Sequence, residues 1–190
     1  MRYGPWTSLW RAVLCAGVAG AIALAPVAAR AQMDVPVRHE WSLKAGAFVP
    51  THSALSRQAA DPWWYVGVDF NPNFVHRPLA GEVYFSADVN WREAAGHRVF
   101  SIPLSVKIKW PLVPEEAAVQ AYGGLGIGAF FINTRFISGA VQPGAKFFIG
   151  AELNEDWFVE LNYDWVDGLT DYTGTGIRLD GLTVLLGYRL

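Results

Sequence analysis

Two histidines lie near residues that could complete a hydrolytic site. His52 and Ser53 are adjacent, Ser56 and Asp61 follow in the same expected loop, and His97 stands in a later one. A serine nucleophile, a histidine base and an orienting carboxylate are the groups that such catalysis requires. Adjacency in the sequence does not place these groups in a catalytic geometry. We therefore expect these histidines, serines and the aspartate to be ordinary polar loop residues. We therefore predict no catalytic residue and no enzyme activity.

Carboxylates also gather among glycines near the end of the chain. The residues concerned are Asp167, Gly168, Asp171, Gly174, Gly176 and Asp180. Such a loop could bind Ca²⁺, but the twelve-residue ligand spacing of a calcium loop is not present. The glycines of the segment 124–128 precede no expected helix, which a phosphate-binding loop would need. We therefore predict no metal site and no cofactor.

Residues 1–31 have the features of a secretory signal peptide. Arg2 and Arg11 supply positive charge, residues 12–25 form an uncharged apolar run, and 29–31 read Ala-Arg-Ala. This order predicts cleavage before Gln32 and a domain at 32–190. The apolar run is shorter than a membrane-spanning helix needs, which disfavours an uncleaved anchor.

The composition excludes several classes of protein. Hydrophobic residues make up 52% of the chain, aromatic residues 14% and charged residues 17%, which is the opposite of a disordered sequence. A net charge of −2 and a pI near 6.1 argue against a nucleic-acid partner. One apolar run alone approaches the length of a helical span, so a multi-span helical membrane protein is excluded.

Apolar and polar residues alternate with a period of two after the leader. In 82–91, for example, Val83, Phe85 and Val89 share one face, and Glu82 and Asp88 share the other. Such alternation is typical of a strand with one apolar and one polar face. It predicts strands at 41–49, 63–70, 82–91, 100–110, 119–132, 145–153, 157–165 and 178–190. Eight strands favour an all-β, closed, antiparallel up-and-down barrel, because closure leaves no unpaired edge.

Tryptophan placement bears on which face of the barrel is apolar. A soluble barrel buries its apolar face, whereas a transmembrane barrel turns that face towards lipid. Every tryptophan after the leader falls at an expected strand end, as in the aromatic girdles at two membrane interfaces. One rim would hold Trp41, Trp110 and Trp157, and the other Trp63, Trp64, Trp91 and Trp165. An eight-stranded barrel is also too narrow to enclose so many large apolar side chains, so we expect them outside.

The polar faces of the strands would then point inwards and carry both signs of charge. The inward charged residues are Lys44, Asp69, Glu82, Asp88, Lys107, Lys109, Lys146, Glu152, Glu160, Asp164 and Arg189. Burial of such charges is tolerable when they are paired. A nearly balanced set in a narrow barrel indicates a paired, hydrogen-bonded plug, and the alternative is a small conducting or ligand-holding lumen.

Two segments resemble those of a known class of barrels. Residues 182–190 alternate to the end with Tyr188 third from last, which resembles the C-terminal signature of bacterial outer-membrane barrels, although Leu190 stands where Phe is usual. Residues 119–129 resemble the tyrosine-and-glycine strand of small barrels of this kind. The mature chain thus resembles the OmpA/OmpX/OmpW-like superfamily of small eight-stranded outer-membrane β-barrels.

The resemblance implies export to the outer membrane of a diderm bacterium. It also implies contact with membrane lipid and lipopolysaccharide, and insertion by the barrel-assembly machinery through the C-terminal strand. We expect a monomer with a structural or surface-interaction role. The alternatives are a narrow channel for small or apolar solutes, a lipid A-modifying barrel enzyme and a soluble ligand-binding barrel.

Overall fold

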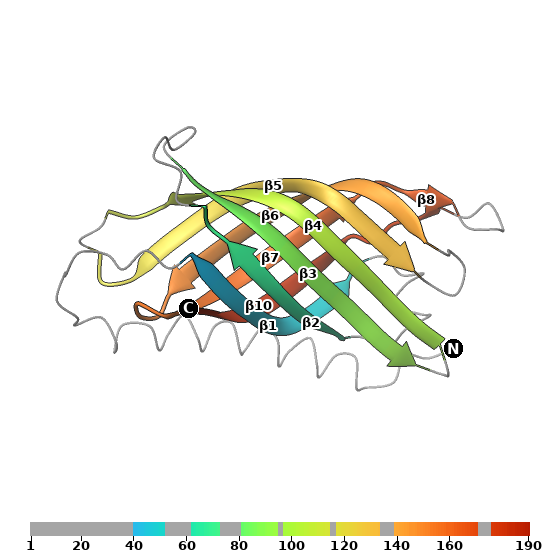
Figure 1. The fold of residues 1–190 in the computed structure, drawn as a ribbon, viewed down its shortest axis with the longest axis horizontal. Helices are drawn as coiled ribbons and strands as arrows, with labels where there is room; N and C mark the ends of the chain where they lie inside the picture. The colour runs from blue at the N-terminus through green and yellow to red at the C-terminus, as the bar shows by residue number, and fades with distance from the viewer. Residues whose placement is uncertain are drawn as a thin grey trace.

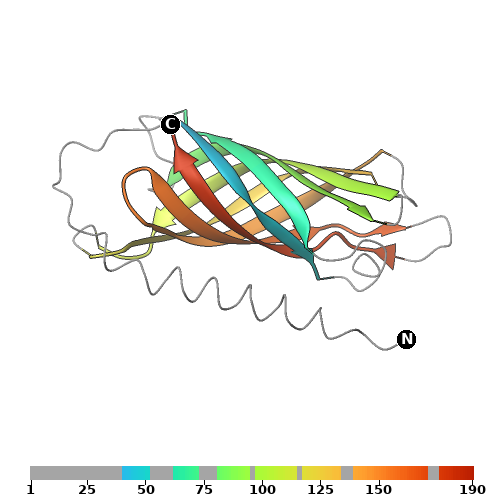
Figure 2. The same ribbon diagram turned by 90° about the horizontal axis from the view of Figure 1, so that it is seen from below.

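The computed structural model describes residues 40–51, 62–72, 81–94, 97–114, 117–133, 139–170 and 176–190. In these ranges eight strands close into one antiparallel barrel of order β1-β10-β7-β6-β5-β4-β3-β2. The barrel strands are β1 (Trp41–Pro50), β2 (Trp63–Phe70), β3 (Glu82–Ala94), β4 (His97–Pro111), β5 (Gln120–Asn133), β6 (Ala140–Glu152), β7 (Trp157–Val166) and β10 (Gly181–Arg189). They run obliquely around a single elongated barrel (Figures 1 and 2). The predicted all-β, closed up-and-down architecture is therefore confirmed.

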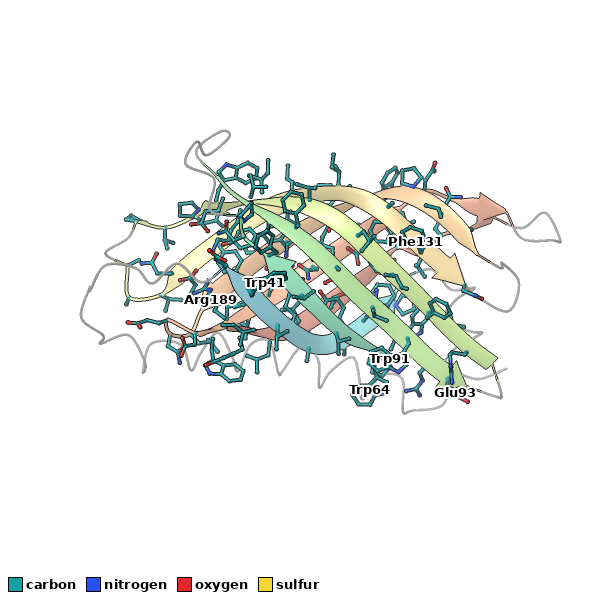
Figure 3. The ribbon with its side chains drawn as sticks, viewed as in Figure 1. Trp41, Trp64, Trp91, Glu93, Phe131 and Arg189 are labelled. Carbon is teal, nitrogen blue, oxygen red and sulfur yellow. The ribbon has the colours of Figure 1, made fainter. Side chains whose placement is uncertain are left out.

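The start of the first barrel strand and the end of the last lie at one end of the barrel. β1 begins and β10 ends at the same end, where the Leu190 amide donates to the Trp41 carbonyl at 2.9 Å. We call this the terminal end, and the opposite one the far end. Figure 3 shows Trp41 and Arg189 towards the terminal end, and Trp64 and Trp91 towards the far end.

Some strands are longer than the alternation predicted. β3 and β4 stay paired as far as Ala94 and His97, across most of the segment between the strands that we predicted at 82–91 and 100–110. β6 begins at Ala140 rather than at 145, because its pairing with β5 continues through Pro143 and Gly144. Cross-strand hydrogen bonding therefore continues past the residues in which apolar and polar side chains alternate.

The last strand begins later than predicted, at Gly181 rather than at 178. Before it, β8 (Leu169–Thr170) and β9 (Gly176–Ile177) form a separate two-stranded sheet. Leu179 is buried, and the Asp180 carboxylate accepts a hydrogen bond from the Val166 amide at 2.9 Å. These contacts hold the chain at the far end of the barrel before it turns into β10.

Glycines on the inner wall make room for aromatic rings from neighbouring strands. A side chain at Gly124 would collide with the ring of Phe148, and one at Gly187 would collide with the ring of Phe158. In the same way Gly150 leaves space for Tyr122. The glycine-rich pattern of β5, β6 and β10 thus lets three rings lie inside a narrow barrel.

Candidate functional site

The strands turn their polar faces inwards, as β4 illustrates. Ser105 and Lys107 are buried inside the barrel, whereas Leu104 and Val106 between them are exposed on its outer surface. Because successive strand residues point to opposite faces, this assignment of one residue fixes the rest of the strand. All eleven inward charged residues named from the sequence lie on inner faces, and they form two networks.

The first network fills the middle of the barrel, and we call it the central network. Its members are Lys44, Asp69, Asp88, Lys107, Lys146, Glu160 and Asp164, none of which is more than 4% exposed. Lys44 Nζ lies 2.7 Å from Asp69 Oδ1 and 2.8 Å from Asp88 Oδ1. Lys107 Nζ lies 2.9 Å from the other oxygen of Asp69, and Lys146 Nζ lies 2.8 Å from the other oxygen of Asp88. Each aspartate therefore bridges two lysines, and the chain of alternating charges crosses five strands.

Neutral groups complete the hydrogen bonding around Asp88. The Tyr65 hydroxyl donates to Asp88 Oδ1 at 2.6 Å, and the Ser86 hydroxyl donates to the same oxygen at 3.2 Å. Buried ion pairs persist when hydrogen bonds satisfy their remaining atoms, and Asp88 meets that condition.

Two carboxylates of the central network are held less closely. Glu160 Oε1 is 3.6 Å from Lys107 Nζ, and Asp164 Oδ1 is 3.4 Å from Lys146 Nζ. Both lysines make shorter contacts with the bridging aspartates. The network thus contains three lysines and four carboxylates, so one negative charge is in excess.

The second network lies at the terminal end, and we call it the terminal network. It consists of Glu82, Lys109, Glu152 and Arg189, which are more exposed than the central residues. Arg189 Nη2 donates to Glu152 Oε1 at 2.6 Å, and Lys109 Nζ lies 3.2 Å from Glu82 Oε2. This network is electrically balanced, with two basic and two acidic groups.

The far end of the interior is apolar, which the sequence analysis missed. The buried cluster there contains Phe48, Trp63, Val99, Phe130, Ile132, Val166 and Leu179. The signal was present in 129–132, Ala-Phe-Phe-Ile, where apolar residues occupy both strand faces rather than one. The interior is therefore layered along its axis, from the terminal network through the central network to this far-end cluster.

The structure corrects the prediction for Trp63. It is 1% exposed and packs against Phe48 with ring centroids 5.4 Å apart, so it belongs to the interior and not to an outer girdle. Its neighbour Trp64 is 62% exposed and lies directly across from Trp91 of β3. Adjacent strand residues point to opposite faces, so Trp63 and Trp64 could not both face outwards.

The remaining girdle tryptophans lie at or near the ends of their strands. At the terminal end, Trp41 and Trp157 are exposed and Trp110 is half-buried; at the far end, Trp165 is exposed and Trp91 is half-buried. Trp41 contacts Phe70 with ring centroids 4.6 Å apart, and Trp157 contacts Tyr188 at 4.9 Å. Aromatic side chains thus gather on the outer surface at both ends of the barrel.

The candidate hydrolytic residues His52, Ser53, Ser56 and Asp61 lie outside the described residues, and so does Asp171. Asp180 has a structural role. Its carboxylate accepts a hydrogen bond from the Val166 amide and lies 3.1 Å from the Arg178 guanidinium. Across the described ranges, no group of three or more His, Cys, Asp or Glu side chains is arranged to hold a metal ion. In that same part of the chain, no helix has the length and apolar character needed to cross a membrane.

Comparison with known proteins gives structural matches only. No protein-family model and no curated protein matches the sequence. The structure is similar to the crystal structure of the N-terminal β-barrel domain of Pseudomonas aeruginosa OprF, with 14% identity and a TM-score of 0.42 over 79% of this chain and 96% of that one. It is also similar to the NMR solution structure of the E. coli outer membrane protein W, with 16% identity and a TM-score of 0.45 over 80% of this chain and 98% of that one.

Proposed function

We propose that this protein is an integral outer-membrane β-barrel with a closed lumen and a structural or surface-interaction role. The observation that carries the proposal is the inverted distribution of side chains, with ion pairs inside and large apolar residues outside. Exposed fractions of 41% to 73% for Val66, Leu125, Ile127, Phe147 and Ile149 leave a wide apolar band around the barrel.

Such a band is costly in water. Monomeric soluble proteins rarely expose continuous apolar patches larger than a few hundred Å². In a bilayer the same side chains meet lipid, and the closed barrel satisfies the backbone hydrogen bonds of every strand internally. The tryptophans near both ends then lie at the two headgroup regions, where amphipathic rings are favoured. These considerations favour a membrane barrel over a soluble ligand-binding barrel.

The packing of the interior favours a closed lumen over a channel. The central network contains side chains that are almost completely buried, and the far-end cluster follows it along the axis. A solute crossing the barrel would have to break bridging ion pairs and displace packed rings. We therefore rank a structural role above a narrow channel for small or apolar solutes, and the proposal includes no catalysis.

The sequence features complete the proposal. Cleavage of the segment 1–31 during export would deliver the domain to the outer membrane of a diderm bacterium. Contact with lipopolysaccharide is proposed from the resemblance to small outer-membrane barrels, and insertion by the barrel-assembly machinery through β10 from the resemblance at 182–190. We propose that the folded protein is a monomer.

The test is cell fractionation followed by electrophoresis with and without boiling. We expect the protein in the outer-membrane fraction, with a migration that changes when the sample is boiled because boiling opens the closed barrel. Recovery as a soluble, folded protein without detergent would refute the membrane placement. Steps of ion conductance from the purified protein in planar bilayers would instead favour the channel.

A further inference from the structure

The hydrogen-bond register fixes how far each residue lies along the barrel axis. A path of directly paired residues that starts at Trp41 of β1 crosses β2 to β6 and reaches Trp165 of β7. The register of β7 with β10 leads it on to Asp180, whose carbonyl accepts from the Thr51 amide at 2.8 Å. The path thus returns to β1 ten residues beyond its start. This stagger gives a strand tilt of about 40°, a rise of about 2.5 Å per residue along a strand, and a rise of about 3 Å per strand along the path.

This geometry places the outward tryptophans on two levels, about 20 Å apart along the axis. The terminal level consists of Trp41, Trp110 and Trp157, and the far level of Trp64, Trp91 and Trp165. The three rings of the terminal level belong to β1, β4 and β7, yet they lie within about 2 Å of one another along the axis. Because such rings mark membrane interfaces, this level sets the barrel axis close to the membrane normal.

The far level is incomplete, because its three tryptophans belong to β2, β3 and β7. These strands are part of a run of five neighbours, β7-β10-β1-β2-β3, which we call the short wall. On the short wall the last outward apolar side chains lie about 17–21 Å above the terminal level. Exposed polar residues then follow in the same outward direction, namely Thr51 on β1, Glu93 on β3 and Asp167 after β7.

The other three strands, β4, β5 and β6, carry apolar residues further, and we call them the tall wall. Phe100, Phe131 and Val141 are their last outward apolar residues and lie about 5 Å beyond those of the short wall. Phe131 is 41% exposed and Val141 is 52% exposed. A tilt of the barrel could not level the two walls, because it would move Trp110 of the tall wall away from the level of Trp41 and Trp157.

We propose that the lipid leaflet at the far end is about 5 Å thinner against the short wall than against the tall wall. The protein would thereby hold a crescent of shorter or more disordered acyl chains beside β7-β10-β1-β2-β3. The proposal rests on the proposed membrane placement. Acyl chains are the occupant because the apolar surface of both walls continues the lipid-facing band, and polar residues end it at two different heights. Bilayers accommodate a short apolar stretch by thinning, at a modest cost per Å.

The test is the depth of a nitroxide spin label in vesicles of dioleoyl phosphatidylcholine, measured from collisions with oxygen and with a nickel chelate. The mature chain is suited to single labels, since the one cysteine, Cys15, lies in the segment 1–31. Val49→Cys on the short wall and Ile102→Cys on the tall wall lie within about 1 Å of one level. We expect the label at 102 to lie about 5 Å deeper in the leaflet than the label at 49. Equal depths, or a deeper label at 49, would overturn the proposal.

A second pair on the same two strands is the control. Leu43→Cys and Ile108→Cys lie at one level, about 5 Å inside the terminal level, and their labels should be equally deep. If both of these labels behaved as exposed to water, the membrane placement would fail and the thinning with it. If they were equally deep and the labels at 49 and 102 were also equally deep, the thinning alone would fail. Dipolar broadening of the label at 102 would show a second copy covering the tall wall, which would overturn the proposal as well.

Thr51 offers a variant that changes the height of the short wall. Thr51→Leu extends the outward apolar surface of β1 beyond the far level, so the label at Val49→Cys should move deeper, towards the depth of the label at Ile102→Cys. Thr51→Ser keeps a hydroxyl at the same place and should leave the depth unchanged. Heat-dependent migration reports that each variant is folded. An unchanged depth in a folded Thr51→Leu barrel would refute the view that polar residues above the short wall set the height of the leaflet.

Discussion

Asp88 and Asp164 offer a controlled measurement of what bridging contributes to the stability of this barrel. Both carboxylates belong to the central network, both are almost fully buried, and both contact Lys146. Asp88 also contacts Lys44 and accepts from the Tyr65 hydroxyl, whereas Asp164 has no hydrogen bond among the described residues. Changing each to Asn keeps its size and removes one negative charge.

The distances between these carboxylates and the lysine nitrogens give the expected magnitudes. At an effective dielectric constant near 20, each 2.8 Å contact of Asp88 is worth about 6 kcal/mol, and the single 3.4 Å contact of Asp164 about 5 kcal/mol. Either substitution also relieves the burial of a charge, which costs several kcal/mol. That relief offsets nearly all of the loss at Asp164 and about half of the loss at Asp88. The remainder is about 6 kcal/mol for Asp88→Asn and about 1 kcal/mol or less for Asp164→Asn.

The assay is reversible urea unfolding in lipid vesicles, followed by tryptophan fluorescence and by heat-dependent migration on gels. The free energy of unfolding should fall for Asp88→Asn, while the dependence on urea concentration stays the same, since the surface exposed on unfolding does not change. Equal losses in the two variants would refute the view that bridging, rather than burial of charge, distinguishes these residues. A larger loss for Asp164→Asn would refute it as well.

Three further predictions test the orientation of the barrel and the sequence-based expectations. In the folded protein, Val106→Cys should react with a lipid-soluble maleimide, because Val106 is 40% exposed on the outer surface. Lys107→Cys should resist a charged thiol reagent, because Lys107 is 2% exposed inside the barrel. The reverse pattern would overturn the assignment of apolar residues to the outside and charged residues to the inside. N-terminal sequencing of the membrane-extracted protein should begin at Gln32, and retention of the segment 1–31 would exclude the proposed export route. Mass spectrometry of lipid A from producing cells should show the same acyl chains for the wild type and for His52→Ala, and a change that depends on His52 would reveal an enzyme.

The sequence predicted the fold well where each strand face was chemically uniform. In β4, every second residue from Ser101 to Lys109 points inwards, so the period of two assigned both faces correctly. The alternation did not reveal the apolar far end of the interior, because at Phe130 and Ile132 the inner face of the strand is as apolar as the outer face. Trp63 was misplaced because its position at a strand end was weighed and its parity was not.

The pairing of the interior charges could not be derived from the sequence. Asp69 bridges Lys44, which is 25 residues away, and Lys107, which is 38 residues away. Which inward residues meet depends on the stagger of the closed barrel, and that stagger follows from the hydrogen-bond register around all eight strands. For the same reason, the approach of Lys107 to Glu160, which is 53 residues away, could be found in the structure alone.

The way in which the central network is shared among strands has a consequence for assembly. Its bridged chain takes one residue from each of β1, β2, β3, β4 and β6, and no single hairpin contains a complete set of partners. The β1–β2 hairpin contains one pair of the central network, Lys44 with Asp69. A β3–β4 or β5–β6 hairpin that entered a bilayer alone would carry Asp88, Lys107 or Lys146 without its partners into hydrocarbon, where each charge is costly. Stepwise insertion of hairpins is therefore penalised, and the strands are expected to cross the membrane together, in one cooperative event that pairs the charges as the barrel closes.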